Sequence, residues 1–178
     1  MTVTIDGSAS VTINSGAVLG LISGTAVAST SGTSITFTSL PSYVKRIMVM
    51  FSSVSTNGTS GYKILIGPST GVETTTYLGE ADTQDGATNA NISTSFYVIG
   101  SGSLSAASVI QGRVELYNHS SNIWVCVSQL GRSDATGTGS SFYCVGSKSL
   151  AGVLTQVQIS TGNGTDTFDA GSINIMYE

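Results

Sequence analysis

Charged side chains are scarce in this chain: Lys, Arg, Asp and Glu together make up 9% of its 178 residues, and His119 is the one histidine. Catalysis usually needs several titratable groups that converge. A lone histidine in the turn-like sequence NHSSN is more often a solvated turn residue than a base. A zinc site would need further His or Cys ligands, and phosphate-loop, dinucleotide-binding and serine-elbow patterns are missing. The sequence therefore predicts a protein that is not an enzyme and holds no cofactor.

Basic residues are also few, six against ten acidic residues, which gives a net charge of −4. Nucleic-acid-binding proteins need a clustered basic face that displaces phosphate counterions, so we expect no nucleic-acid partner. No apolar run approaches the roughly 20 residues that cross a bilayer. The opening MTVTIDGSAS lacks the basic and apolar parts of a signal peptide. We therefore expect no membrane insertion, and synthesis in a cytoplasm.

Only two cysteines are present, Cys126 in WVCV and Cys144 in FYCV, and each lies in an apolar, strand-like run. If the two runs form a hairpin, the thiols are neighbours on adjacent strands and could be bonded. The simpler interpretation is a pair of buried, reduced thiols that act as small hydrophobic side chains.

The chain is instead rich in Ser, Thr, Gly and Asn, with 40% hydrophobic residues and a mean hydropathy of +0.26. Disordered chains combine low hydrophobicity with high net charge, so this composition indicates a folded domain. Its surface is wetted by hydroxyls and amides. Such a surface suits contact with carbohydrate, although a β protein with no ligand would have the same composition.

Helical periodicity is almost absent, and the one candidate, SLSAASVIQG, is bracketed closely by Gly102 and Gly112. The remainder consists of short β-branched or aromatic runs separated by Gly, Ser, Asn and Asp clusters. The sequence therefore predicts an all-β, jelly-roll-like antiparallel β-sandwich with little or no helix. The expected strands lie at about 26–29, 34–39, 43–54, 62–67, 95–99, 108–117, 122–130, 141–147, 152–160 and 169–177.

One expected strand, YVKRIMVMF, is apolar on both faces. With a two-residue period, Ile47 and Val49 point to one side while Met48 and Met50 point to the other. The run NIWVCVSQL has the same property. Because a strand exposed on one face should alternate apolar with polar, we expect a second layer over this sheet: a loop, the N-terminal segment or another subunit.

Residues 1–24 form a separate segment ahead of the sandwich domain, 25–178. Its part AVLGLISG is apolar but rich in glycine, so it would make a poor isolated strand or helix. Two possibilities remain open: an attachment or swapped-strand segment that packs on a neighbouring chain, and a terminal strand folded back onto its own domain. The candidate subunit interface comprises Met48, Met50, Val18, Leu19 and Leu21.

Residues 67–93 are the longest stretch without a strong core signal, and long loops on β scaffolds often carry binding function. Tyr77 could stack on a sugar ring while Glu80, Asp82 and Asp85 accept hydrogen bonds from it. These four residues are the candidate ligand-contact loop. Asp82 and Asp85 also suggest calcium, and the carboxylates a glycoside hydrolase, but acidic loop residues are usually only solvated, and we expect no metal.

Two stretches, GTSITFTSLPSYVKRIMVMFSSVSTNGTS and TGNGTDTFDAGSINIMYE, resemble a β-sandwich module of tailed-bacteriophage virion proteins. That module recurs in the distal part of tail fibres and in small virion structural proteins. The resemblance implies a structural or adhesive module located in the virion, a homotrimer, and tail or capsid proteins as partners. It supplies no catalytic residues. The chain lacks the heptads and collagen-like repeats that form a fibre shaft.

The expected function is therefore that of a non-enzymatic virion protein, a tail-fibre-type module that adheres to the host surface, with a surface glycan as its ligand. The alternative is a capsid decoration protein, a cement protein or head fibre, that stabilises the particle. A free-standing carbohydrate-binding module and a polysaccharide depolymerase are further alternatives.

Overall fold

The computed structural model describes residues 11–13, 16–18, 20–83, 88–89, 93–100, 104–134 and 139–178; for 11–13, 16–18, 81–83 and 88–89 it describes the backbone alone. These residues form strands and no helix. The strands are β1 (Val11–Ile13), β2 (Gly16–Val18), β3 (Ile22–Ser23), β4 (Val27–Ala28), β5 (Ser34–Phe37), β6 (Arg46–Thr56), β7 (Tyr62–Gly67), β8 (Tyr77–Thr83), β9 (Thr88–Asn89), β10 (Phe96–Tyr97), β11 (Val109–Ser120), β12 (Ile123–Ser133), β13 (Ser140–Ser149), β14 (Gln156–Thr161) and β15 (Phe168–Tyr177).

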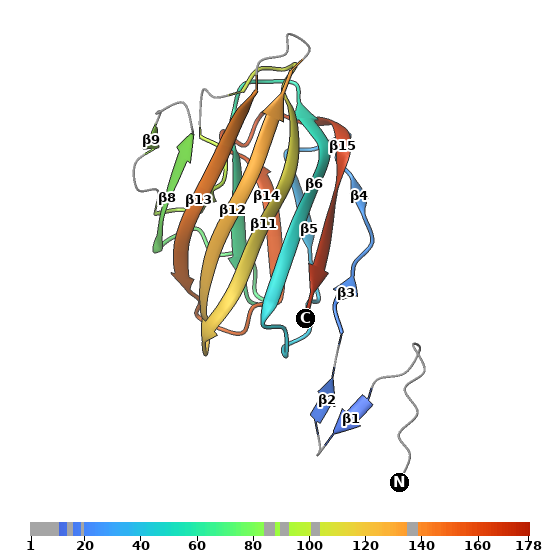
Figure 1. Ribbon diagram of the computed structural model, residues 1–178. Coiled ribbons are helices and arrows are strands. Elements are labelled where there is room, and N and C mark those ends of the chain that lie inside the picture. The colour runs from blue at the N-terminus through green and yellow to red at the C-terminus, as the bar shows by residue number, and fades with distance from the viewer. Residues whose placement is uncertain are drawn as a thin grey trace.

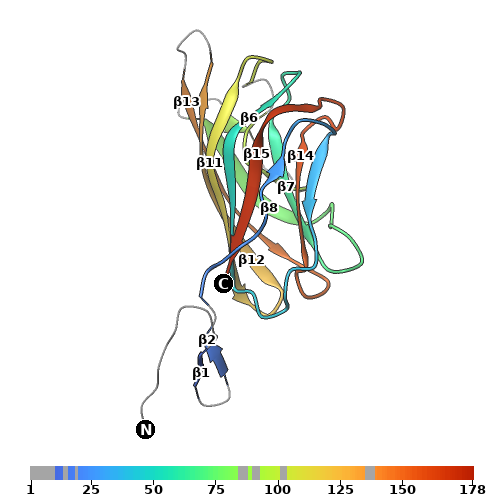
Figure 2. The same cartoon turned by 90° about the vertical axis from the view of Figure 1, so that its right-hand side faces the viewer.

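Two antiparallel sheets pack face to face. The four-stranded sheet has the order β10-β7-β14-β5, and the nine-stranded sheet has the order β3-β15-β6-β11-β12-β13-β8-β9, with β4 also on β15. Figure 1 views the larger sheet with β5 and β14 behind it, and Figure 2 shows the two layers from the side. The chain crosses repeatedly between the layers, while β11, β12 and β13 form a meander within one sheet. The β-sandwich is confirmed, and its jelly-roll character stays a prediction.

Alternating side chains fill the space between the sheets. On β6, Ile47 and Val49 are fully buried and Phe51 is nearly so, and each such side chain contributes roughly 1.5–3 kcal/mol of burial free energy. Tyr62 of the smaller sheet packs against two rings of the larger one, with centroid distances of 6.3 Å to Phe51 and 5.7 Å to Phe168. These aromatic contacts hold the two layers in register.

All ten predicted strands have a counterpart, but the loop predicted over residues 67–93 is wrong in its middle. β8 pairs with β13 along seven positions, from Tyr77 opposite Lys148 to Thr83 opposite Phe142. The sequence YLGEADT hid this strand because it offers one buried large side chain, Tyr77, whereas Leu78 points outward and is 65% exposed.

The chain before residue 30 folds back onto its own domain from Ile22 onward. β3 and β4 pair with β15 at the edge of the large sheet. The Gly24 N–H donates to the Ile175 carbonyl at 2.7 Å, and the Ser29 N–H donates to the Gly171 carbonyl at 3.0 Å. The predicted boundary at residue 24 therefore falls in the link between two short edge strands, β3 and β4, that pair with the same strand of the domain. β1 and β2 pair with each other and with no other described strand, and Figures 1 and 2 draw this hairpin apart from the sandwich.

A glycine fixes the close approach of β11 to β12. Gly112 has a φ of +124°, and a Cβ at this position would lie 2.4 Å from the Gln129 carbonyl oxygen. The β11–β6 register shifts beside it, between Ile110 and Gly112, where Ser53 of β6 has a φ of 53°. The irregularity is a β-bulge, and it leaves Gln111 and Arg113 exposed on either side of a position without a side chain.

Candidate functional site: a groove on the outer face of the large sheet

The outer face is the side of the nine-stranded sheet turned away from the smaller sheet. Its side chains alternate along each strand with the buried core residues. On the central strands they are Leu78 and Glu80 of β8, Tyr143 and Val145 of β13, Val125, Val127 and Gln129 of β12, Gln111, Arg113, Glu115 and Tyr117 of β11, and Met48 and Met50 of β6.

The strand register arranges these side chains in straight rows across the sheet. One row runs Glu80, Val145, Val127, Glu115 and Met48, in directly opposed pairs. The next row begins at the Asp82 backbone and continues Tyr143, Gln129, Arg113 and Met50. Because opposed Cβ atoms in a sheet lie about 4.5–5.5 Å apart, each member of a row is in contact range of its neighbours in that row.

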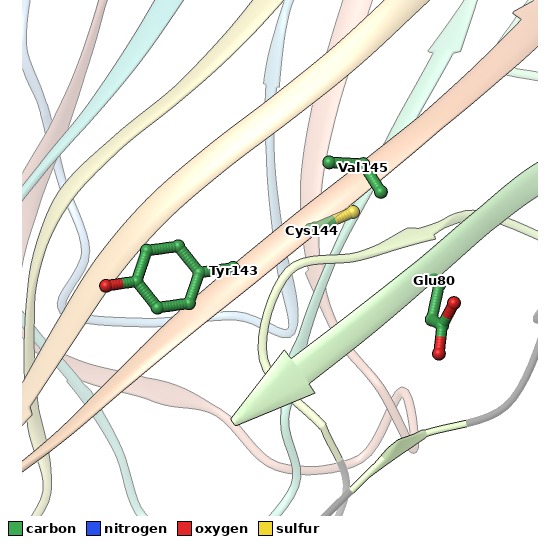
Figure 3. A pocket seen from close by; sticks show the side chains of 4 residues that line it. All are labelled: Glu80, Tyr143, Cys144 and Val145. Carbon is green, nitrogen blue, oxygen red and sulfur yellow. The ribbon is translucent and has the colours of Figure 1, made fainter. Parts of the chain in front are cut away.

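Three shallow hollows follow one another over these rows. The first, about 240 Å³, is lined by Glu80, Tyr143, Cys144 and Val145, and Figure 3 shows Glu80 on β8 with Val145 on the neighbouring strand β13 and Tyr143 further along that strand. The second, about 220 Å³, and the third, about 290 Å³, share Arg113 and Gln129, and Tyr143 also lines the second. We call this track from β8 to β11 the sheet groove, defined by Glu80, Tyr143, Gln129, Arg113 and Gln111.

Ion pairs fix the charges beside the groove. Glu115 accepts from the Arg46 Nη2 at 2.9 Å and faces the Arg113 Nε at 3.4 Å, and Arg46 also reaches Glu178 at 3.2 Å. The hydrogen bond from Arg46, with help from Arg113, holds the pKa of Glu115 below its usual range. The Glu115 carboxyl is therefore ionised, and its contact with the Arg113 Nε orients Arg113.

Large apolar and aromatic side chains are unusually exposed on this face. Val145 is 58% exposed, Tyr143 41% and Val127 40%. Contiguous apolar exposure of this kind commonly marks a binding surface. An aromatic ring beside amides, a guanidinium and a carboxylate can stack on a sugar ring and exchange hydrogen bonds with its hydroxyls. Because these groups stand on paired strands, their spacing is fixed by the sheet.

The four residues of the predicted ligand-contact loop have different outcomes. The prediction for Tyr77 is wrong: its ring is fully buried edge-on to Phe96, with centroids 4.8 Å apart. Its hydroxyl accepts from the Ile66 N–H at 2.9 Å and donates to the Glu73 carbonyl at 2.9 Å, and burial raises its pKa. Glu80 is exposed and lines the groove. Asp82 is described by its backbone in β8, and Asp85 lies outside the described residues.

The candidate interface residues are likewise divided. Met48 and Met50 are half-buried on the outer face between β11 and β15, and no described element lies over them. Leu21 is 47% exposed at the sheet edge. Val18 is described by its backbone in β2, and Leu19 lies outside the described residues. The expected cover over the second face of β6 is therefore not supplied by the described part of the chain.

The cysteines belong to the core. Cys126 and Cys144 lie on adjacent strands, each offset by two positions from the other, and both are buried free thiols. Burial raises the pKa of Cys126, so this thiol stays protonated. The simpler interpretation of the sequence is confirmed.

Sequence reasoning missed Tyr143, Gln129, Arg113 and Gln111. A signal was present in SSFYCV, where a buried Phe142 next to an equally large Tyr143 places one aromatic ring on each face of the strand. Tyr143 stands in the middle of a strand, so the length of a loop gives no indication of it.

Comparison with family models, with curated proteins and with solved structures gives no match for this chain. Among the described residues, no group of three or more His, Cys, Asp or Glu side chains is placed to hold a metal ion. The part of the chain that the structure describes also has no helix with the length and apolar character needed to cross a bilayer.

Proposed function

We propose that this protein is a non-enzymatic tailed-phage virion module that attaches to host-surface glycan through the sheet groove. The observation that carries the proposal is Tyr143, a 41%-exposed aromatic side chain between two hollows, with Gln129 and Arg113 next to it in the same row. The virion context rests on the resemblance of the two end segments to phage β-sandwich modules.

The groove has the dimensions of an extended ligand. It crosses β8, β13, β12 and β11, which are consecutive in the sheet, and strands are about 4.8 Å apart, so its length across the strands is about 14 Å. Its three hollows are shallow, and each shares lining residues with the next. A chain of sugars lying across the strands would touch Tyr143 with one ring and the amide side chains with the next.

A homotrimer would strengthen such a site. One exposed aromatic stack and a few hydrogen bonds give weak binding, because solvated polar contacts each contribute about 1 kcal/mol. Three grooves on one particle component act together and raise the avidity by several orders of magnitude if the glycan repeats. The half-buried Met48 and Met50, on the same face but toward β15, suit the contact between copies.

An array of bacterial capsular and O-antigen polysaccharides, probed with the purified protein, tests the binding function. Tyr143→Ala should lower the affinity for bound polysaccharides about tenfold, the equivalent of one lost ring contact. Tyr43→Ala is a matched control, because Tyr43 is 43% exposed but precedes β6 and lines none of the three hollows of the groove. Equal affinity of wild type and Tyr143→Ala would refute the site.

Light scattering tests the assembly. The full chain should have the mass of a trimer, and Met48→Lys should shift it toward the monomer, because a charge would be buried in the contact. A chain without residues 1–19 shows whether β1 and β2 contribute. A monomeric full chain would refute the trimer.

A second candidate function, capsid decoration, is favoured by the aliphatic side chains Leu78 and Val145, 65% and 58% exposed beside Glu80. Such side chains suit a protein surface. Immunogold labelling of the phage separates the two functions: label at the tail tip supports adhesion, and label over the head supports decoration.

A further inference from the structure

We infer that the glycan recognised by the sheet groove is acidic, and that its carboxylate, that of a uronic or similar acidic sugar, binds Arg113. This inference rests on the proposed function and names the chemical class of the ligand. It is carried by the position of Arg113 in the groove and by the N–H donors of its guanidinium that have no partner in the described part of the chain.

Glu115 orients Arg113 but occupies only one of its guanidinium nitrogens. The Arg113 side chain is 51% exposed, and its Nε faces Glu115 at 3.4 Å. Within the described part of the chain the two terminal Nη groups have no partner. Arg113 lines both the second and the third hollow, together with Gln129. Its planar fork of donors is held at the Nε end by Glu115 and belongs to a residue of the groove wall.

The other five basic residues of the chain are engaged elsewhere. Lys45 donates to Asn118, Arg46 pairs with Glu115 and Glu178, Lys63 donates to the Gly162 carbonyl, Arg132 contacts Ser140, and Lys148 is buried against Glu73. In a chain of net charge −4 with six basic residues, a half-exposed cation in the groove is a specific feature and not part of a general basic surface.

The geometry favours a carboxylate over other ligand groups. Two parallel N–H donors of a guanidinium match the two oxygens of a carboxylate, which gives a stronger and more directional contact than a hydroxyl. Gln111 and Gln129 flank Arg113 and supply amide donors for the remaining lone pairs. The repulsion between Glu115 and the ligand is reduced, because Glu115 also pairs with Arg46, which it shares with Glu178.

The groove also has a direction. Glu80 lies on β8, three strand spacings from Arg113 on β11, or about 14 Å, which exceeds the Debye length of about 8 Å at physiological salt. The acidic sugar would therefore lie at the β11 end. Neutral sugars would occupy Tyr143 and the β8 end, where a second carboxylate would face Glu80.

Carboxyl reduction of the polysaccharides tests this assignment. Each polysaccharide bound on the array is compared with its own derivative in which carbodiimide and borohydride convert the carboxylates to primary alcohols. The bound polysaccharides should contain acidic sugars, and reduction should lower affinity about tenfold or more. Arg113→Gln should lower affinity for the native form equally and leave affinity for the reduced form unchanged. Arg113→Lys, which keeps the charge but not the fork, should be intermediate.

Lys63→Gln is the matched control, because it removes one positive charge from the four-stranded sheet and should leave binding unchanged. Binding of neutral polysaccharides that depends on Tyr143 but not on Arg113 would overturn this inference and leave the proposed function intact. No binding by any polysaccharide would overturn both. Circular dichroism of each variant verifies that the fold is retained.

Discussion

The pair Lys148–Glu73 offers a sharp test of how the region before β8 is held. Lys148 lies on β13 with 2% of its side chain exposed, in contact with the Glu73 carboxylate. Its ammonium also donates to Thr76 Oγ1 and to the Ser149 carbonyl, both at 2.9 Å, and lies 5.3 Å from the centre of the Tyr77 ring. The perturbation is Glu73→Gln, which removes one charge and keeps the shape.

The expected cost follows from the burial of the two partners. Removing one member of a fully buried ion pair costs roughly 3–5 kcal/mol, because the other charge is left unpaired. Glu73 retains 21% exposure, so water screens part of the interaction, and we expect Glu73→Gln to lower the free energy of unfolding by about 2–3 kcal/mol. The Ala151 N–H donates to the Glu73 carboxylate at 2.8 Å, and the amide oxygen of a glutamine can accept the same hydrogen bond. The loss of stability therefore measures the effect of removing the charge.

Urea denaturation at pH 7, followed by tryptophan fluorescence, measures this value. Lys148→Met in the Glu73→Gln background should recover most of the loss, because an apolar side chain of similar length replaces the unpaired ammonium. A cost for Glu73→Gln below about 0.5 kcal/mol, typical of an exposed pair, would refute the reasoning. So would a double variant no more stable than the single one.

Three further outcomes are expected from the same kind of measurement. The pKa of Glu73, Glu115 and Asp166 is lowered in the fold, in each case by hydrogen bonds to its carboxylate that outweigh desolvation. The stability that these groups contribute is complete above their unfolded pKa and is lost as the pH falls through the folded pKa. The free energy of unfolding should therefore be constant above about pH 5 and decline below about pH 4, and a decline that begins near pH 7 would contradict this. Gly112→Ala should cost about 2 kcal/mol or more in urea unfolding, because its φ of +124° and the Gln129 carbonyl leave no room for a Cβ, and an unchanged midpoint would show that β11 relaxes freely. Tyr77→Phe should cost about 1–3 kcal/mol by leaving buried backbone groups unpaired, and a neutral result would mean that water replaces the hydroxyl.

The alternation of apolar residues was sufficient to predict the strands, because burial on one face leaves a two-residue pattern wherever the strand is long. β8 was not predicted because one of its inward positions is Gly79, which has no apolar side chain and where a Cβ would lie 3.0 Å from the Val145 carbonyl oxygen. A strand with small inward residues carries no pattern. The groove was not predicted for another reason: the register between β13, β12 and β11 brings its residues into rows. This register is a three-dimensional property that the spacing of residues within one strand does not contain.

The two-faced strands also have a physical explanation that the residues alone could not supply. Met48 and Met50 share rows with Glu115 and Arg113, so the apolar outer side of β6 is continuous with the groove and is not an isolated patch. If both proposals hold, the outer face is divided: the β6–β15 half packs against another copy, and the β8–β13 half stays open to glycan. Arg113, next to Met50 in its row, then lies at the border. A copy seated on Met50 would exclude water from one side of its guanidinium and strengthen its contact with a carboxylate. Trimer formation and acidic-glycan binding should therefore be coupled, with Met48→Lys weakening both and Tyr143→Ala weakening the second alone.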